Sequence, residues 1–294
     1  MNKSQKNLPA LSILLAGSLW GVTGIFVRII NAAGLDNFQL MFFRSIITAV
    51  GIGGFLLITD KSKMKIDLKD WWYFFGSGIL SFFTFSLCYF YTISAASMSV
   101  AAILLYTAPF FVMLMSAIFF KEKITAAKII ALIMAAVGCF MICGTETNVT
   151  LTPVIVFIGI CSGFCYALYS IFGRVALKKY SSATVTAYTF IFSTIGTLFV
   201  VDFNQIGSVA ASRPDIILLT VIFTVLSSVL PYIFYTYGLK YVESGKASIM
   251  ATIETVVASL VGILVFNEKL TLIGFVGMVL VLFAVVMLNI KKSV

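Results

Sequence analysis

Two charged residues lie well inside long apolar runs of this chain, where a charge needs a partner or a polar cavity. Glu254 stands about ten residues from either end of the run 245–266, and Arg44 lies inside the run 36–58. In a lipid bilayer a charge at that depth costs several kcal/mol unless it faces a cavity or a partner. We therefore expect Glu254 to bind a coupling proton, or to offset the charge of a cationic substrate. The alternative is a protonated carboxyl group that is hydrogen-bonded to a neighbouring helix.

Arg44 also has two interpretations. Its guanidinium could receive a substrate carboxylate through a bidentate contact. It could equally extend to the outer membrane interface and keep its charge in water, and its place near one end of the run favours this second interpretation slightly.

Aromatic side chains share helical faces with glycine, alanine and serine in several of the runs. A bulky ring on a small-residue face suggests the wall of a cavity, and aromatic rings stabilise an enclosed cation. For the glycines Gly17, Gly21, Gly159 and Gly163 we favour close packing of helix backbones instead. The aromatic residues expected to contact a substrate are Trp20, Tyr91, Tyr106, Tyr166 and Tyr235.

Two prolines lie well inside apolar runs, away from their ends. Pro109 leaves the carbonyl of Leu105 without its helical partner, and Pro231 does the same for Ser227. Broken helices with free carbonyls are where membrane transporters build binding sites and hinges, so Pro109 and Pro231 are predicted hinge residues.

Composition excludes several kinds of chemistry. The chain has no histidine, which removes histidine metal sites, Ser/His and Cys/His nucleophile pairs and histidine proton relays. The five cysteines form no C-x-x-C motif, and no glycine-rich phosphate loop with its lysine is present. We therefore expect no enzyme activity, no catalytic residues, no metal and no cofactor.

The elements that position these residues must be membrane helices. Apolar residues make up 61% of the 294 residues and charged residues 11%, whereas soluble proteins carry about 25% charged residues. A bilayer crossing needs roughly 20 apolar residues. Ten apolar runs have about this length and predict an all-α polytopic membrane protein with ten transmembrane helices: 8–30, 36–58, 71–95, 98–120, 126–144, 153–173, 183–201, 216–239, 245–266 and 272–290.

The basic residues set the expected orientation. The net charge of +9 could suggest nucleic acid, but the lysines form short clusters between apolar runs, and we expect no nucleic-acid partner. With the N-terminus inside, most of the 20 basic residues fall in cytoplasmic segments, as the positive-inside rule requires. Both termini are therefore expected in the cytoplasm.

The chain repeats itself at a constant separation. Gly17 aligns with Gly163, and the segment 120–125 (FKEKIT) aligns with 266–271 (FNEKLT). The chain thus divides into two repeats, 1–144 and 152–294, with five spans each. Because five is odd, the second repeat is inserted upside down. Inverted repeats are the architecture of secondary transporters that alternate access to a central site.

These motifs resemble the EamA branch of the drug/metabolite transporter superfamily. The resemblance covers the whole chain and rests on the openings of both repeats and on segments in spans 4 and 9: 17–21, 163–167, 105–109 (LYTAP) and 253–255. Span 9 of this family commonly reads Glu-Pro, but Thr255 replaces that proline here, so the resemblance implies the carboxylate of span 9 and leaves its kink open. The resemblance implies metabolite transport, often export of amino acids or amines.

We therefore expect a multi-pass secondary transporter of the bacterial cytoplasmic (inner) membrane that exports small polar metabolites, amino acids or amines, by alternating access around a central cavity. Its expected partners are this substrate, the lipid bilayer and protons as a candidate coupling ion, and the chain is expected to be a monomer or weak dimer. Two alternatives stay open. One is uptake of a cationic or quaternary amine such as choline, and the other is a passive facilitator or channel.

Overall fold

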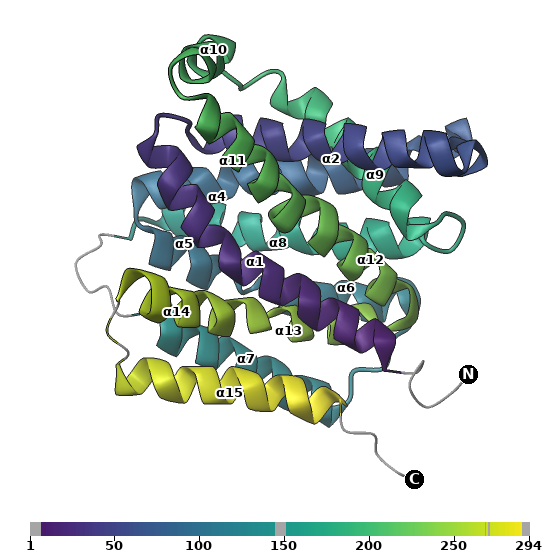
Figure 1. Ribbon diagram of the computed structural model, residues 1–294. Helices are drawn as coiled ribbons and strands as arrows, with labels where there is room; N and C mark the ends of the chain where they lie inside the picture. The colour runs from purple at the N-terminus through teal and green to yellow at the C-terminus, as the bar shows by residue number, and fades with distance from the viewer. Residues whose placement is uncertain (1–6, 145–150, 268, 270, 290–294) are drawn as a thin grey trace.

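The computed structural model describes residues 7–144, 151–267, 269 and 271–289. All regular secondary structure in these ranges is helical. Long helices lie side by side in a bundle, and the described chain begins and ends on the same side of it (Figure 1). We call the side on which α1 begins the N-terminal face, and the other side the opposite face.

The first half of the chain contains five crossings, two of them made of joined segments. Its elements are α1 (Leu8–Ala32), α2 (Asn37–Thr59), the short 3-10 helices Lys61–Met64 and Leu68–Asp70, α3 (Trp71–Phe75), the π-helix η3 (Gly76–Phe83), α4 (Thr84–Ala95), α5 (Met98–Leu105), α6 (Ala108–Phe120) and α7 (Ala126–Cys143).

The second half follows the same order with one added helix. Its elements are α8 (Pro153–Ala176), α9 (Ser182–Thr197), α10 (Phe203–Ser212), α11 (Pro214–Thr224), the π-helix η4 (Val225–Val229), α12 (Leu230–Tyr241), α13 (Ser244–Ala251), α14 (Ile253–Phe266) and α15 (Leu272–Asn289).

Within the described ranges, nine helices, counting joined segments as one, are long and apolar enough to cross a membrane. They coincide with nine of the ten predicted spans. The tenth, α9, has 16 residues and is therefore about 24 Å long at 1.5 Å per residue. It ends at Thr197, short of the predicted end at 201, because the chain turns there. The predicted all-helical polytopic membrane fold is confirmed.

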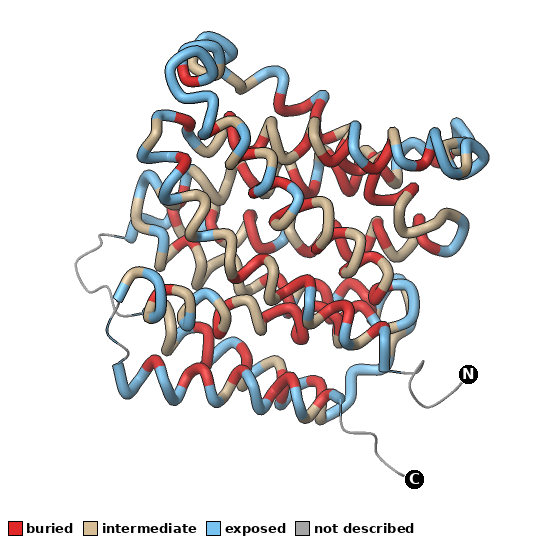
Figure 2. Tube along the Cα trace, in the orientation of Figure 1, coloured by how far each residue is buried: buried red, intermediate tan, exposed pale blue. Residues whose placement is uncertain are grey.

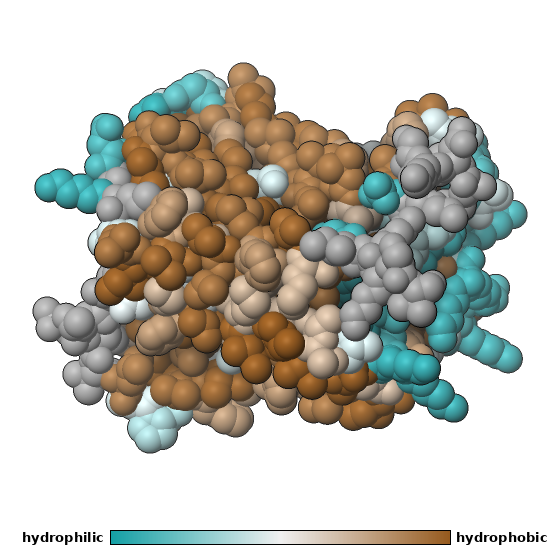
Figure 3. Space-filling view, turned by 90° about the horizontal axis from the view of Figure 1, so that it is seen from below, coloured by the Kyte–Doolittle hydropathy of each residue, from teal (hydrophilic) through white to brown (hydrophobic). Residues whose placement is uncertain are grey.

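The outer surface of the bundle is apolar, as a protein surrounded by lipid requires. Buried residues lie along the inner faces of the helices (Figure 2). Large apolar side chains such as Phe55, Phe157, Leu264 and Phe283 are at least half exposed. Figure 3 shows a broad apolar surface, with hydrophilic residues gathered at the end that corresponds to the N-terminal face. The exposed apolar surface is the part that contacts lipid.

The two halves repeat fine details of the backbone. Span 4 is interrupted at Tyr106 and Thr107, and span 9 is interrupted at Thr252. After each interruption the helix ends on a left-handed residue, Lys121 with φ 55° and Asn267 with φ 54°. These positions are related by the same separation as the sequence repeat, so the repeat is also visible in the backbone.

The loop expected at 202–215 contains the helix α10. Asp202 caps it by accepting hydrogen bonds from the backbone N–H groups of Asn204 and Gln205. The Gln205 side chain then joins the two halves on the opposite face, because its amide oxygen accepts a bond of 2.8 Å from the buried Gln39.

Candidate functional site

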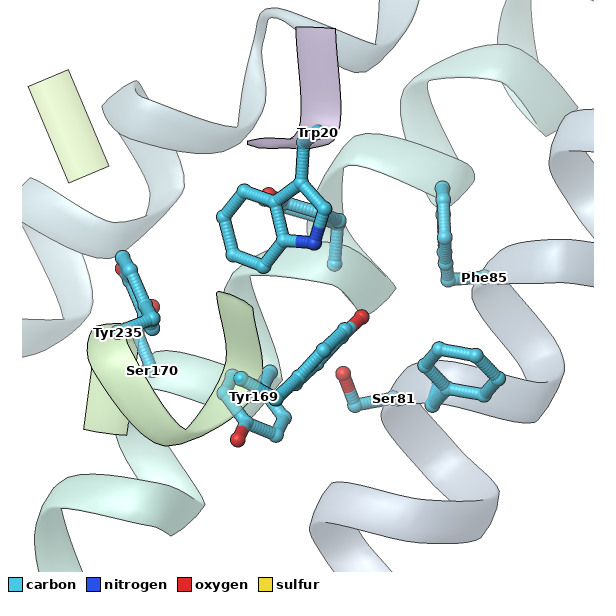
Figure 4. Close-up of a pocket in the computed structure, with 9 residues that line it drawn as sticks. Trp20, Ser81, Phe85, Tyr169, Ser170 and Tyr235 are labelled. Atoms are coloured by element: carbon cyan, nitrogen blue, oxygen red, sulfur yellow. The ribbon is translucent and has the colours of Figure 1, made fainter. Parts of the chain in front are cut away.

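Two adjoining cavities lie at the centre of the bundle and share Tyr166 as a common wall. The first, which we call the aromatic cavity, is drawn in Figure 4: Trp20 enters it from one side, while Ser81 and Phe85 face it from another. The second, the Glu254 cavity, is bordered by the interruptions of spans 4 and 9. The full lining of the aromatic cavity is Trp20, Ser81, Phe82, Phe85, Tyr166, Tyr169, Ser170, Tyr232 and Tyr235.

Trp20 is fixed by a carbonyl that Pro231 leaves free. Proline has no N–H group, so the Ser227 carbonyl lacks its helical donor. The Trp20 Nε1–H donates to this carbonyl at 3.2 Å. The indole also packs edge-on against Tyr232, with ring centroids 5.3 Å apart. Pro231 itself lies in the first turn of α12, directly after the π-helix η4.

The Arg44 guanidinium points into the bundle. Its Nε donates to the Ser228 hydroxyl at 2.8 Å, and its Nη2 donates to the Ser227 carbonyl at 3.4 Å. Its Cζ lies 5.3 Å from the centre of the Phe82 ring, a lining residue of the aromatic cavity. The interpretation that Arg44 extends to the outer interface is therefore wrong, because the π-helix η4 offers it buried oxygen acceptors.

The tyrosines of the aromatic cavity hold one another in place. The hydroxyl of Tyr235 hydrogen-bonds with that of Ser170 at 2.8 Å, which joins α12 to α8. Tyr169 and Tyr232 meet at right angles with centroids 5.1 Å apart. Such edge-to-face pairs fix ring positions. The wall of this cavity is thus aromatic and carries several hydroxyl groups.

Glu254 lies in the first turn of α14 and lines the second cavity together with Tyr106 and Tyr166. The positive end of a helix dipole favours a carboxylate at this position. Among the ion pairs of the described residues none includes Glu254. Its carboxylate is therefore available to a ligand or a proton in the cavity. The remaining lining residues are Leu105, Ala108, Pro109, Ser248, Ala251 and Thr252.

Span 9 is broken although it has no proline. The Thr252 hydroxyl donates to the Ile249 carbonyl at 2.7 Å, and the Thr255 hydroxyl donates to the Thr252 carbonyl at 2.9 Å. These hydroxyls add to the backbone N–H groups that the same two carbonyls accept. The kink that Thr255 put in question is therefore present, as a break between α13 and α14. Pro109 lies in the first turn of α6, just after the matching interruption of span 4.

Glycines of the opposite half pack on both interruptions. A Cβ at Gly17 of α1 would lie 2.9 Å from the Ala251 carbonyl oxygen, and one at Gly163 of α8 would lie 2.4 Å from the Thr107 hydroxyl. No side chain fits in either place. These glycines thus pack helix backbones closely, as we favoured from the sequence.

The comparison with known families agrees with this architecture. Residues 7–144 and residues 153–290 each match the model of the EamA-like transporter family. The chain belongs to this family. It is accordingly a membrane transporter of the drug/metabolite transporter superfamily with two EamA repeats, and not an enzyme.

Relatives of this EamA-like transporter match it over most of their length. An uncharacterized transporter of Archaeoglobus fulgidus is 28% identical over 92% of both chains. The uncharacterized inner membrane transporter YicL of Salmonella typhimurium is 22% identical over 99% of this chain and 98% of its own. A solved crystal structure superimposes with a TM-score of 0.78 over 97% of this chain and 96% of that one, at 14% identity, and thus shares the fold.

Two predicted substrate-binding residues of this EamA-like transporter, Arg44 and Tyr91, line neither cavity, although Arg44 lies beside the aromatic one. Tyr91 is 47% exposed on the bundle surface, so its assignment to the site is wrong. Tyr91 stands six residues after the lining residue Phe85 on α4, about 240° around the helix from it, and so lies on another face. Ser81 and Phe85, four residues apart, face the cavity instead.

The structure brings the other predicted residues together and adds new ones. Trp20, Tyr166 and Tyr235 line the aromatic cavity, and Tyr106, Pro109 and Glu254 line its neighbour. Tyr169 and Tyr232 were missed, although each stands three residues from a predicted tyrosine on the same helix and so shares its face. Ser81, Phe82, Phe85, Ser170 and Ser248 were also missed.

Proposed function

We propose that this EamA-like protein is a secondary transporter that moves small polar metabolites, amino acids or amines, by alternating access around the two joined cavities. The observation that carries the proposal is the Glu254 carboxylate, which lines a cavity next to an aromatic one. The proposed direction is export. The proposed location is a bacterial inner membrane with the N-terminal face in the cytoplasm. The name of the relative YicL supports this location.

An ammonium group is the substrate feature that suits these cavities. A carboxylate attracts it electrostatically, and aromatic faces stabilise it further once it leaves water. A proton on Glu254 would remove the attraction, so the same residue could couple amine release to proton uptake. The proposed hinges are Pro109 and Pro231, which begin the helices next to the cavities.

Arg44 could also receive the carboxylate of an amino acid. A guanidinium has five N–H donors, and the contacts with Ser227 and Ser228 engage its Nε and Nη2. Its position over Phe82 places it beside the aromatic cavity. A zwitterion would then lie with its ammonium toward Glu254 and its carboxylate toward Arg44.

The test is transport by purified protein in liposomes, with an amine, a zwitterionic amino acid and a carboxylate of similar size as candidate substrates. We expect saturable flux of the amine or the zwitterion, trans-stimulation by the same compound, and loss of both in Glu254→Gln. The matched control is Asp60→Asn, which changes a carboxylate in a loop outside the spans. If Glu254→Gln transports as well as the parent at every pH, both proposed roles of Glu254 are refuted. Flux without trans-stimulation would favour a channel.

A second candidate function is uptake of a quaternary amine. It is favoured by the aromatic cavity, whose lining residues carry no charge. Such an enclosure binds a cation that has no N–H group to donate. Vesicles of known orientation separate the two functions, because uptake predicts flux toward the N-terminal face and inhibition by tetramethylammonium.

A further inference from the structure

The segments α6 and α13 are the parts of spans 4 and 9 that lie toward the N-terminal face. They pack together on one side of the Glu254 cavity. A Cβ at Gly245 of α13 would lie 3.4 Å from Met113 Cα and 3.5 Å from the Ser116 hydroxyl, both on α6. The corresponding segments toward the opposite face, α5 and α14, are not among the helix pairs in close contact. Ser248 of α13 lines the cavity itself. The seam between α6 and α13 therefore lies between the cavity and the N-terminal face.

A buried carboxylate holds this seam at its end. Glu122 follows α6, and its side chain is only 7% exposed. Its Oε1 accepts a hydrogen bond of 2.8 Å from the backbone N–H of Ser244, and its Oε2 accepts one of 3.3 Å from Gly245. These are first-turn N–H groups of α13, which have no partner within their own helix. A residue of the first half thus caps a helix of the second half.

Lys128 completes the group from α7. Its Nζ forms an ion pair of 2.7 Å with Glu243, donates to the Lys123 carbonyl at 2.9 Å and lies 3.9 Å from Glu122. The Lys128 side chain is 8% exposed. Buried charges remain stable only while they are paired. Separation of α13 from α6 and α7 would therefore break the contacts of Glu122 and Glu243 together.

We propose that Glu122 and Lys128 form a latch that holds α13 against α6, and that its release opens the Glu254 cavity toward the N-terminal face. This inference rests on the proposed alternating access. In this proposal, two charged residues outside the cavities control the opening toward the N-terminal face.

A proline substitution removes one contact of the latch and leaves the charges in place. Ser244 is the first residue of α13, a position where proline is favoured in helices. The preceding Glu243 has φ −57° and ψ 139°, which is the conformation that a residue before proline adopts. Ser244→Pro therefore removes the N–H that donates to Glu122. Ser244→Ala keeps this N–H and is the matched control.

The readout is the accessibility of Ser248→Cys to a membrane-impermeant thiol reagent, in protein whose five native cysteines are replaced by alanine. The reagent is added to the N-terminal face of oriented vesicles. We expect Ser244→Pro, Glu122→Ala and Lys128→Met to raise the labelling rate about tenfold. This factor corresponds to loss of one hydrogen bond to a charged group in a two-state equilibrium. Ser244→Ala should leave the rate unchanged.

Two results would overturn the latch. One is an unchanged rate in both Ser244→Pro and Lys128→Met, and the other is an equal increase in Ser244→Ala. Thermal unfolding of each variant verifies that it is folded, and Lys128→Met provides the test if the proline variant does not fold. The labelling experiment needs no substrate. If the variants change the labelling rate as expected but the protein transports none of the tested compounds, the proposed function is refuted and the latch is not.

Discussion

Gly163→Ala tests whether the close approach of α8 to the interruption of span 4 is as tight as the structure indicates. The new Cβ would lie 2.4 Å from the Thr107 hydroxyl oxygen and 3.1 and 3.2 Å from the carbonyl oxygens of Leu104 and Leu105. The hydroxyl already donates to the Leu104 carbonyl at 2.7 Å, so it cannot rotate away without losing that bond. Two of the three obstacles are backbone atoms, which move only if the helices separate.

The magnitude follows from a comparison with a glycine that has free space. Overpacking in a tight site costs about 1–3 kcal/mol. Alanine in place of glycine within a helix also gains about 1 kcal/mol. Gly24 lies in α1 with no heavy atom within 4 Å of its would-be Cβ, so Gly24→Ala shows the gain alone. The gain cancels in the difference, and Gly163→Ala should be about 1–3 kcal/mol less stable than Gly24→Ala.

The assay is reversible unfolding in mixed detergent micelles, with the free energy of unfolding measured for both variants and the parent. Thr107→Ala removes the nearest obstacle, so the double variant with Gly163→Ala should be less destabilised than the sum of the single variants. Equal stabilities of Gly163→Ala and Gly24→Ala would refute the reasoning, since the interruption would then adapt to a methyl group.

Three further predictions follow from single contacts. Arg44→Lys should lower the free energy of unfolding by about 1–3 kcal/mol, because a single Nζ replaces the two separate nitrogens, Nε and Nη2, that donate to the two serines of η4; unchanged stability in the same micelle assay would contradict this. Tyr91→Phe should leave transport within about twofold of the parent, whereas Tyr235→Phe, which loses the bond to Ser170, should weaken transport more; the reverse order in liposome flux would place Tyr91 at the site. Asp67 and Asp70 raise the pKa of Lys179. The stability lost in Lys179→Met should therefore be fully visible below about pH 10 and should vanish as rising pH deprotonates the lysine. Melting temperatures measured in a pH series check this.

Periodic apolar runs and a constant repeat separation predicted the spans and the two-repeat organisation, because both depend only on residue type and position. Trp20 and Tyr166 could be predicted for the same reason, since they stand on regular α-helices with small neighbours. Tyr91 and Tyr235 each follow a π-helical segment, yet only Tyr235 lines the cavity, so the face that such a helix turns inward depends on how its neighbours pack against it. No residue pattern near Tyr91 shows that packing.

The two interrupted spans show that proline alone does not predict where a span is interrupted. Pro109 follows the interruption of span 4, yet span 9 breaks at the matching place with Thr255 where a proline was expected. What the two places share is a glycine face from the other half, Gly163 on one and Gly17 on the other. Close backbone approach keeps each interruption in contact with a helix of the opposite half, while threonine hydroxyls add hydrogen bonds to carbonyls that already accept backbone N–H groups. The breaks are thus tertiary features that depend on both halves, and a motion of one half against the other acts on them directly.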